Sequence, residues 1–329
     1  MKSAILISGG AGYIGSATVA YLISRHQPVV IVDNFSTGHR DAIHPQAIFY
    51  QGDIQDESLI DLICQRHHIE SVIHFAASAL VGESMIHPDL YYVNNVAATA
   101  CFTRSLIRNQ VRRLVFSSTA ATYGIPTSMP IVEEEPQHPI NPYGRSKLMI
   151  EQILDDYDQA YGFRSIRLRY FNACGAYENW GEDHRPETHL IPNLIRAALA
   201  PEHPFILYGQ DYPTSDGTCI RDYIHIHDLA AAHLLALQYL WENEAGLSLN
   251  LGNGYGFSNL EVLKATEQIL NRQIPIERAP RRPGDPAVLI ASSQKARKIL
   301  GWEPQYSSLE SIIRSAVEWH RRFPDGYAR

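Results

Sequence analysis

A tyrosine and a lysine four residues apart are the strongest candidates for chemistry in this sequence. Tyr143 and Lys147 lie in the segment 141–147, where Asn141 is a good helix N-cap and Pro142 a good first helical residue. A helix that begins here places Tyr143 and Lys147 on one face. A tyrosine hydroxyl has an ordinary pKa of about 10, so its use as a base at neutral pH must overcome about 4 kcal/mol, and a nearby ammonium favours the phenolate. Tyr143 is therefore a candidate general base with Lys147 as its partner; the alternative is an amphipathic helix whose tyrosine and lysine face solvent.

Polar side chains lie close to the ends of the fourth and fifth predicted strands. The apolar run 113–117 continues into Ser118 and Thr119, at the carboxyl edge of the sheet. A hydroxyl there can hydrogen-bond a substrate oxygen and relay its proton to Tyr143. Ser118 and Thr119 are both candidates, and a capping role for either is the competing interpretation. We expect Asn95 at the start of a helix, as a cap or close to the end of the fourth strand.

A glycine-rich turn near the N-terminus predicts a phosphate site. Residues 4–8 read as a short buried strand, Gly9, Gly12 and Gly15 follow at intervals of three, and 16–22 continues with helical spacing. Such a turn offers bare backbone N–H groups at a helix N-terminus, where the helix dipole also favours an anion. The strand–turn–helix context is that of the dinucleotide fingerprint, whereas glycines alone would fit any strand-to-helix turn.

An acidic residue at the end of the second predicted strand indicates which dinucleotide binds. Asp33 follows the apolar run 28–32 and lies eighteen residues after Gly15. A carboxylate here accepts hydrogen bonds from ribose hydroxyls and repels a 2′-phosphate, so we expect NAD rather than NADP. The alternative is a solvated Asp-Asn turn. Asp53 and Ile54 follow the third strand, where they can hold the adenine ring.

Strand-like apolar runs alternate with helical segments through the first half of the chain. The runs are at 4–8, 28–32, 47–50, 71–75, 113–117 and 165–170. This alternation predicts an α/β fold with a doubly wound parallel Rossmann sheet, whose ligands sit at the carboxyl ends of its strands. We expect an NAD-binding Rossmann domain at 1–172 with a return near 221–255, and a second, smaller α/β domain at 173–329 that is mainly substrate-binding. A cleft between the two should hold the second ligand.

Composition argues against several classes of protein. The 329 residues carry a net charge of −7 with no basic block, which argues against a nucleic-acid partner. No apolar run approaches the roughly eighteen residues of a membrane span, so we expect no membrane partner. Four scattered cysteines without CxxC spacing indicate reduced thiols in a cytoplasmic protein. His67-His68 and the pair His225/His227 lack the cysteine or carboxylate company of a metal site, so we expect no metal.

Together these segments resemble the NAD-dependent epimerase/dehydratase family of the extended short-chain dehydrogenase/reductase superfamily, over nearly the whole chain. The tyrosine–lysine and glycine motifs mark only the superfamily, whereas 208–225 and 279–285 are more specific to its UDP-hexose 4-epimerases. The matching segments are 9–15, 33–34, 52–54, 74–77, 81–84, 91–95, 143–147, 168–172, 208–214, 216–218, 221–225 and 281–285.

The resemblance implies roles for positions of this sequence. Tyr143 is implied as the catalytic base and acid, Lys147 as its partner and the anchor of the nicotinamide ribose, and Thr119 as the hydroxyl that contacts the sugar. Besides Tyr143 and Lys147, the implied cofactor contacts are Gly9, Gly12, Tyr13, Ile14, Gly15, Asp33, Asn34, Phe35, Ser36, Thr37, Gly38, Asp53, Ile54, Phe75, Ala76, Ala77, Ser78, Ala79, Asn95 and Phe171. Besides Thr119 and Tyr143, the implied substrate contacts are Asn172, His189, Leu190, Tyr208, Arg221, Arg282 and Asp285. Arginines suit this task because their forked donors match a diphosphate.

Two positions depart from the family pattern. Ala79 stands where some members carry a lysine, so one contact to a cofactor phosphate is absent. Leu289 occupies the position that gates N-acetylated sugars, and it is neither a large tyrosine nor a small residue. Acceptance of N-acetylated sugars is therefore open.

The activity implied by the resemblance is reversible inversion at C4 of a UDP-hexose, UDP-galactose to UDP-glucose, in galactose metabolism with NAD held throughout. The alternatives are a 4-epimerase of UDP-N-acetylhexosamine or UDP-glucuronate, a nucleotide-sugar 4,6-dehydratase and a non-catalytic NAD-binding sensor. Family dehydratases place Asp-Glu after the strand-end threonine, where Ala120-Ala121 stand here. A homodimer through the helices around 92–109 and 142–160 is also implied.

Overall fold

A seven-stranded parallel sheet forms the centre of the computed structural model, which describes residues 3–282 and 285–327. Its strands are β1 (Ala4–Ser8), β2 (Val29–Asp33), β3 (Ile48–Gln51), β4 (Ile69–His74), β5 (Arg113–Thr119), β6 (Arg164–Tyr170) and β11 (Leu247–Leu251). They lie in the order β11-β6-β5-β4-β1-β2-β3, with Ile7 of β1 paired to Ile31 of β2 and to Ile73 of β4. The direction of winding reverses between β1 and β4, which confirms the predicted doubly wound sheet.

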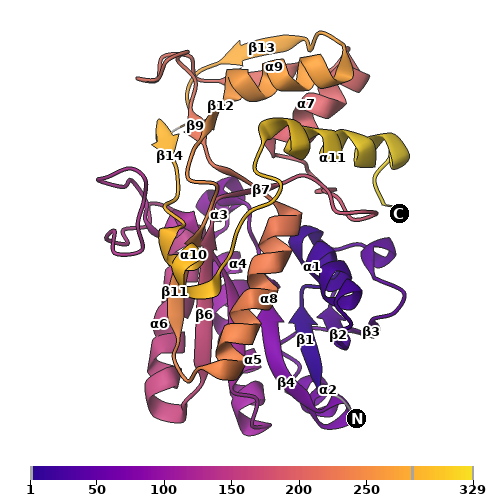
Figure 1. Cartoon of the computed structure of the whole chain (residues 1–329), viewed down its shortest axis with the longest axis vertical. Coiled ribbons are helices and arrows are strands. Elements are labelled where there is room, and N and C mark those ends of the chain that lie inside the picture. Colours follow the sequence, from indigo (N-terminus) through magenta and orange to yellow (C-terminus); the bar gives the residue numbers. More distant parts are fainter. Residues whose placement is uncertain (1–2, 283–284, 328–329) are drawn as a thin grey trace.

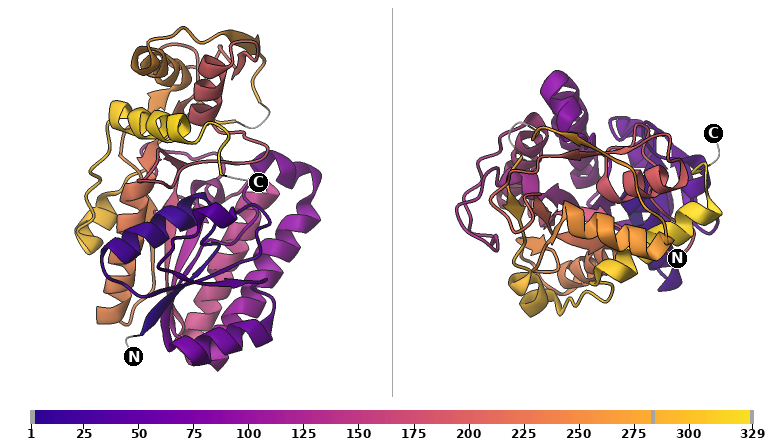
Figure 2. Two further views of the ribbon diagram at one scale, coloured as in Figure 1. Left: turned by 90° about the vertical axis from the view of Figure 1, so that its right-hand side faces the viewer. Right: turned by 90° about the horizontal axis from the view of Figure 1, so that it is seen from above.

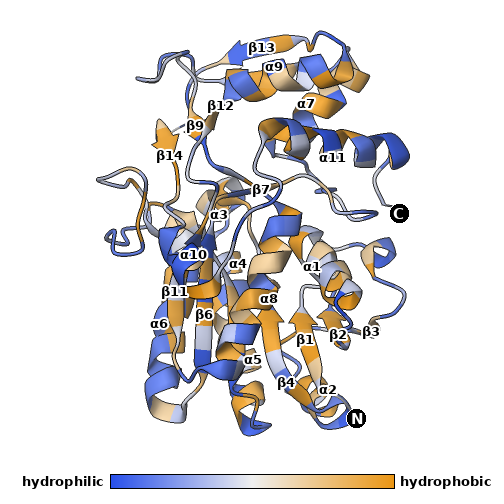
Figure 3. Ribbon diagram, viewed as in Figure 1, coloured by the Kyte–Doolittle hydropathy of each residue, from blue (hydrophilic) through white to orange (hydrophobic). Residues whose placement is uncertain are grey.

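Helices cover both faces of this sheet (Figures 1 and 2). One face carries α1 (Tyr13–Ser24) and α8 (Ile226–Glu242), and the other carries α2 (Glu57–His67), α5 (Ala98–Arg108) and α6 (Pro142–Tyr161). Because successive strand residues point to opposite faces, Ile5 and Ile7 join the core under α1 and α8, while Ala4 and Leu6 join the core under α2, α5 and α6. Strands β1 and β2 are largely hydrophobic along their length, as expected of strands buried on both sides (Figure 3).

Much of the remaining chain packs beyond the carboxyl end of β1 (Figure 1). A separate apolar core joins α7 (Leu190–Leu199), α9 (Asn259–Leu270) and α11 (Leu309–Arg322) through side chains such as Leu194, Val262 and Ile313. The elements after β6 are β7 (Asn172–Cys174), α7 (Leu190–Leu199), β8 (Phe205–Tyr208), β9 (Ile220–Arg221), β10 (Tyr223–His225), β12 (Phe257–Ser258), α9 (Asn259–Leu270), β13 (Ile276–Ala279), β14 (Val288–Leu289), α10 (Gln294–Leu300) and α11 (Leu309–Arg322). The chain thus returns to the main sheet at β11 before it ends. The domain boundary at residue 172 stays a prediction.

The prediction that a helix begins at Asn95 is wrong. Helix α3 (Val81–Ile86) is followed by α4 (Pro88–Tyr91), which runs directly into a π-helical turn at Tyr92–Ala97 and then into α5. Asn95 lies inside this turn and is fully buried. Single π-turns within helices are often found at functional sites.

Two residues of a predicted segment lie outside the described part of the chain. They are Pro283 and Gly284, which belong to the matching segment 281–285.

Within the described part of the chain, no helix combines the length and the apolar character needed to cross a membrane. Short 3-10 helices occur at Arg40–Ala42 and Ala120–Thr122.

Helix α6 begins where its sequence predicts. The Oδ1 atom of Asn141 accepts a hydrogen bond from the Gly144 backbone N–H at 2.8 Å, and Pro142 occupies the first turn. The helix ends at Gly162, whose φ of 63° is left-handed. A fixed N-terminus matters because Tyr143 is the second residue of this helix.

We expect Asn141→Ala to lower the free energy of unfolding by about 1 kcal/mol, because the substitution removes the oxygen that caps Gly144. Asn141→Asp keeps an acceptor and is the matched control. Urea unfolding of the three proteins should give a lower midpoint for Asn141→Ala alone. Equal midpoints would show that the cap does not stabilise α6.

Candidate functional site

Tyr143 and Thr119 meet at the carboxyl edge of the sheet. Thr119 is the last residue of β5, Tyr143 lies in the first turn of α6, and their side chains are neighbours. Burial raises the pKa of the Tyr143 phenol above its ordinary value, while the nearby Thr119 hydroxyl acts in the opposite direction. Thr119 and Tyr143, whose proximity was only a hypothesis from the sequence, are therefore neighbours.

The neighbouring hydroxyl of Ser118 is directed elsewhere. Its Oγ donates to Oε1 of Glu151 at 2.5 Å, and the side chain is buried. Ser118 lies on the strand face that α6 covers, as do Leu114 and Phe116, whereas Thr119, at the end of the strand, lies next to Tyr143. The geometry favours Thr119 over Ser118 as the hydroxyl next to the phenol.

Lys147, one helical turn after Tyr143, is also buried. Its Nζ donates to the Ser117 carbonyl oxygen at 2.8 Å and lies 4.8 Å from the centre of the Phe116 ring. Burial lowers the pKa of Lys147 to about 7, although the negative charge of Glu151 acts to raise it. Burying an ammonium without hydrogen-bonding or charged partners costs free energy. The burial of Lys147 one helical turn from Tyr143 therefore needs a physical reason.

A buried ion pair that the sequence analysis missed supports the same helix. The guanidinium of Arg169 in β6 donates to Glu151 of α6 through Nε to Oε1 at 3.0 Å and Nη2 to Oε2 at 2.5 Å. Both side chains are about 95% buried. Glu151 lies one helical turn after Lys147, and that spacing was the available signal in the sequence.

The glycine turn has the shape of a phosphate cradle. Gly9 has a φ of +76°, and a Cβ there would lie 2.5 Å from the Ala76 backbone nitrogen. A Cβ on Gly15 would lie 2.1 Å from the Gly9 carbonyl oxygen, so both positions require glycine. Among the described residues no side chain caps α1 at Gly12, which leaves first-turn amides such as that of Ile14 available for an anion. This cradle fits the diphosphate of a dinucleotide.

Asp33 closes the cradle on its other side. Its Oδ2 accepts from the Ala11 backbone N–H at 2.9 Å and its Oδ1 from that of Phe35 at 2.8 Å. Burial raises the pKa of Asp33, and these two backbone hydrogen bonds act to lower it. Each carboxylate oxygen keeps a lone pair for a ribose hydroxyl. Asn34 donates to Asp53 at 2.9 Å, which ties the predicted ribose loop to the predicted adenine contact.

Asn95 fixes the segment after β4. Its Oδ1 accepts from the Ser78 backbone N–H at 2.8 Å, and its Nδ2 donates to the Ser78 carbonyl at 3.0 Å and to Ser146 Oγ at 3.1 Å. The segment 75–79 is thereby joined to α6, on which Tyr143 lies. A hydrogen-bonded mid-helix side chain replaces the predicted cap.

The remaining cofactor positions lie around these features. Tyr13 and Ile14 open α1, and the Tyr13 hydroxyl donates to the Gly175 carbonyl at 2.6 Å. Ile54 is 7% exposed and packs into the core under α2, α5 and α6. Phe171 is partly buried between β6 and β7. Their contacts to a cofactor stay predictions.

The predicted substrate positions form two pairs. Arg221 makes an ion pair with Asp285, and the Arg282 guanidinium lies 4.3 Å from the centre of the Tyr208 ring. Leu289 of β14 pairs with Arg221 of β9 in a parallel register. The position implicated in sugar selection therefore lies directly beside a predicted diphosphate anchor.

Other predicted substrate positions lie on different elements. The Asn172 side chain donates to the Asp222 carbonyl oxygen at 3.0 Å, which links β7 to the segment between β9 and β10. His189 precedes α7 and Leu190 is its first residue. The described contacts of His189 are with acidic side chains rather than with the arginine pairs.

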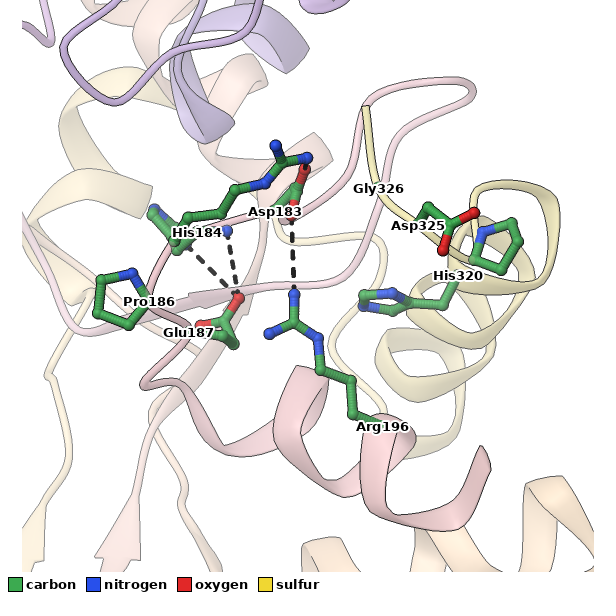
Figure 4. A pocket seen from close by; sticks show the side chains of 10 residues that line it. Asp183, His184, Pro186, Glu187, Arg196, His320, Asp325 and Gly326 are labelled. Atoms are coloured by element: carbon green, nitrogen blue, oxygen red, sulfur yellow. Dashed lines mark hydrogen bonds and ion pairs between the residues drawn. The ribbon is translucent and has the colours of Figure 1, made fainter. Parts of the chain in front are cut away.

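Those acidic contacts belong to a cluster before α7. Burial would raise the pKa of Glu182, but His189 and His184 hold it at about 2. Burial would lower the pKa of His189, but Glu182 and Glu187 raise it to about 10. His184 and Glu187 also line a pocket of about 430 Å³ beside Arg196 (Figure 4). No prediction from the sequence covered this cluster.

Comparisons with known proteins agree with this geometry. The sequence pattern of the NAD dependent epimerase/dehydratase family matches residues 5–252. The chain is 50% identical over 327 residues to a UDP-glucose 4-epimerase of Halalkalibacterium halodurans, covering 99% of this chain and 98% of that protein. It is also similar to a crystal structure of a UDP-glucose 4-epimerase, with a TM-score of 0.97, 49% identity and coverage of 99% of this chain and 100% of that one. A UDP-glucose 4-epimerase from Brucella ovis in complex with NAD gives a TM-score of 0.93 at 45% identity, covering 96% and 98% of the two chains.

We expect Gly9→Ala to abolish NAD binding, because its Cβ would collide with the Ala76 backbone at a φ that alanine avoids. Gly82→Ala is the matched control, since a Cβ there meets nothing within 4 Å. Isothermal titration of each purified variant, stripped of nucleotide, with NAD separates the two. Native affinity in Gly9→Ala would contradict the assignment of the cradle.

Proposed function

Because the chain belongs to the NAD dependent epimerase/dehydratase family, we propose that it inverts the configuration at C4 of a UDP-hexose and interconverts UDP-galactose and UDP-glucose. The observation that carries this proposal is the Tyr143 phenol beside the Thr119 hydroxyl, with the buried Lys147 ammonium one helical turn away. This arrangement suits removal and return of a hydroxyl proton. Inversion at C4 needs both operations at the hydroxyl that this carbon carries.

Tyr143 acts as base and acid in this proposal. NAD, when bound, supplies the hydride acceptor and donor for C4. Tyr143 takes the proton of the sugar O4 as C4 is oxidised and returns it when the 4-keto sugar is reduced from its other face. Thr119 holds O4 in reach of the phenol oxygen.

Lys147 makes the Tyr143 base possible. Burial of Tyr143 raises the pKa of its phenol, which opposes proton removal at neutral pH. A positive charge one helical turn away favours the phenolate and lowers that pKa. The hydrogen bond from Nζ to the Ser117 carbonyl fixes this charge in place.

The proposed reaction requires the 4-keto sugar to rotate within the site so that its other face is reduced. Firm binding of the UDP portion and loose binding of the sugar suit this rotation. Arg221 and Arg282, the proposed diphosphate contacts, carry the forked donors that match phosphate oxygens. Asp285 positions Arg221 through their ion pair. Asn172, His189, Leu190 and Tyr208 complete the proposed substrate side.

Sequence features separate this proposal from its rivals. A 4,6-dehydratase would need an acid–base pair after the strand-end threonine, and the residues there are Ala120 and Ala121, which form a 3-10 turn. A non-catalytic sensor has no use for Tyr143 next to Thr119. Leu289 leaves a 4-epimerase of N-acetylated UDP-sugars as the alternative substrate class.

Incubation with UDP-galactose and no added cofactor tests the proposal. We expect UDP-glucose from the native protein, and Tyr143→Phe should lower turnover by orders of magnitude while UDP binding stays nearly unchanged. Tyr157→Phe on the same helix is a matched control. A 4-keto-6-deoxy product would indicate dehydration, and full activity of Tyr143→Phe would contradict the mechanism.

We also propose a homodimer through α3, α4, the π-turn and α6. Large apolar side chains are exposed on these elements: Val81, Met85, Ile86, Leu90, Val93 and Met149. These elements pack against one another, so their exposed side chains form a candidate shared face. Exposed apolar patches of this kind mark interaction surfaces.

A cytoplasmic location stays a prediction, and the four free cysteines support it.

Ile86, which is 73% exposed, offers the sharpest test of the dimer. We expect light scattering to give twice the chain mass for the native protein and the chain mass for Ile86→Asp, because a buried carboxylate in the interface is costly. Ile125→Asp, at another isoleucine that is 66% exposed, is the control and should remain dimeric. A native monomer would refute the dimer.

A further inference from the structure

Two glutamates and two histidines converge in the segment that precedes α7. The ligand atoms of Glu182, His184, Glu187 and His189 all lie within 4.8 Å of one another. Nδ1 of His189 is 2.9 Å from Oε1 of Glu182 and 2.9 Å from Oε1 of Glu187. Nδ1 of His184 is 3.2 Å from Oε1 of Glu182 and 3.9 Å from Oε2 of Glu187.

Hydrogen bonding accounts for only part of this arrangement: Nδ1 of His189 is hydrogen-bonded to Oε1 of Glu187 at 2.9 Å. Oε1 of Glu182 and Nδ1 of His184 are shielded from solvent and, among the described residues, neither has a hydrogen-bond partner, although they lie 3.2 Å apart. The Glu182 side chain is 94% buried. Two buried polar atoms that face one space without a hydrogen bond between them can both serve as ligands of a cation.

Charge and spacing point to a divalent cation. The Glu182 and Glu187 side chains are only 6% and 1% exposed, so two carboxylate charges are held close together away from water. Ligands at about 2.0–2.2 Å from a tetrahedral zinc ion lie roughly 3.3–3.6 Å from one another, close to the spacing of these atoms. Magnesium and calcium prefer oxygen ligands alone, whereas imidazole nitrogen with carboxylate oxygen suits zinc and its neighbours.

We propose that Glu182, His184, Glu187 and His189 bind one zinc-type divalent cation in a closed, four-ligand site. This departs from the expectation of no metal, which rested on other histidines, and it replaces the substrate contact implied for the His189 side chain, whose Nδ1 faces Glu182 and Glu187. Asp183 is not a ligand, because it pairs with Arg185 at 2.7 Å and Arg196 at 3.7 Å (Figure 4).

The place of the site indicates a structural role. Four protein ligands leave no open position for a substrate, as in structural rather than catalytic zinc sites. The His184 ring meets Tyr13, the first residue of α1 behind the glycine turn, edge-on at 6.0 Å. His189 directly precedes α7. The cation would therefore fasten the segment 182–189 between the dinucleotide cradle and α7.

Metal titration of the purified full-length protein tests the proposal. After treatment with a chelator and dialysis, the native protein should bind one Zn²⁺ per chain by isothermal titration. Co²⁺ in its place should give the intense visible absorption of a tetrahedral site. Zn²⁺ should also raise the Tm, since a ligand that binds only the folded state stabilises it.

Three variants decide which side chains are responsible. His184→Gln and Glu182→Gln should each lose stoichiometric Zn²⁺ binding and the rise in Tm, whereas His203→Gln, at an exposed histidine outside the cluster, should keep both. Circular dichroism checks that each variant is folded. Absence of saturable binding by the native protein, or native binding by both cluster variants, would overturn the site and leave the cluster as ion pairs only.

Discussion

The buried ammonium of Lys147 is the constraint on which the proposed catalytic site depends. A charge in this position is stable only when polar groups surround it, and the Ser117 carbonyl supplies a hydrogen bond of 2.8 Å. Glu151, one helical turn further, acts against the effect of burial on the pKa of Lys147. Arg169 in turn holds Glu151 from β6. The charge beside Tyr143 is thus maintained by a chain of contacts from helix to sheet.

The same packing separates a fixed region from an adjustable one. Around the cradle, backbone hydrogen bonds to Asp33 and the Asn95–Ser78 pair fix the chain without mobile side chains. On the proposed substrate side, Arg221 is partnered by an acid and Arg282 lies over an aromatic ring. Those contacts position the guanidinium groups and keep their remaining donors for phosphate oxygens. A cofactor that stays bound needs the fixed region, and a sugar that must rotate between oxidation and reduction needs the adjustable one.

Local signals made much of this predictable, and packing determined the rest. Apolar runs located the parallel strands, and the N-cap at Asn141 located the start of α6. The choice of Thr119 over Ser118 depends on the contact of Ser118 with Glu151 and on the place of Thr119 at the end of β5, which no short motif encodes. The Glu151–Arg169 pair and the π-turn at Asn95 depend on partners distant in the chain. The acid–histidine cluster was visible as spacing in 182–189, yet its convergence required the fold.

Titration of the Tyr143 phenol in the NAD-bound protein tests the central claim most directly. The difference in ultraviolet absorbance between the native protein and Tyr143→Phe isolates the phenolate, and the same difference is measured on a Lys147→Met background. The account predicts a phenol pKa well below its ordinary value of about 10 with Lys147 present, and a clear rise without it. An unchanged pKa in Lys147→Met would contradict the role of the buried ammonium.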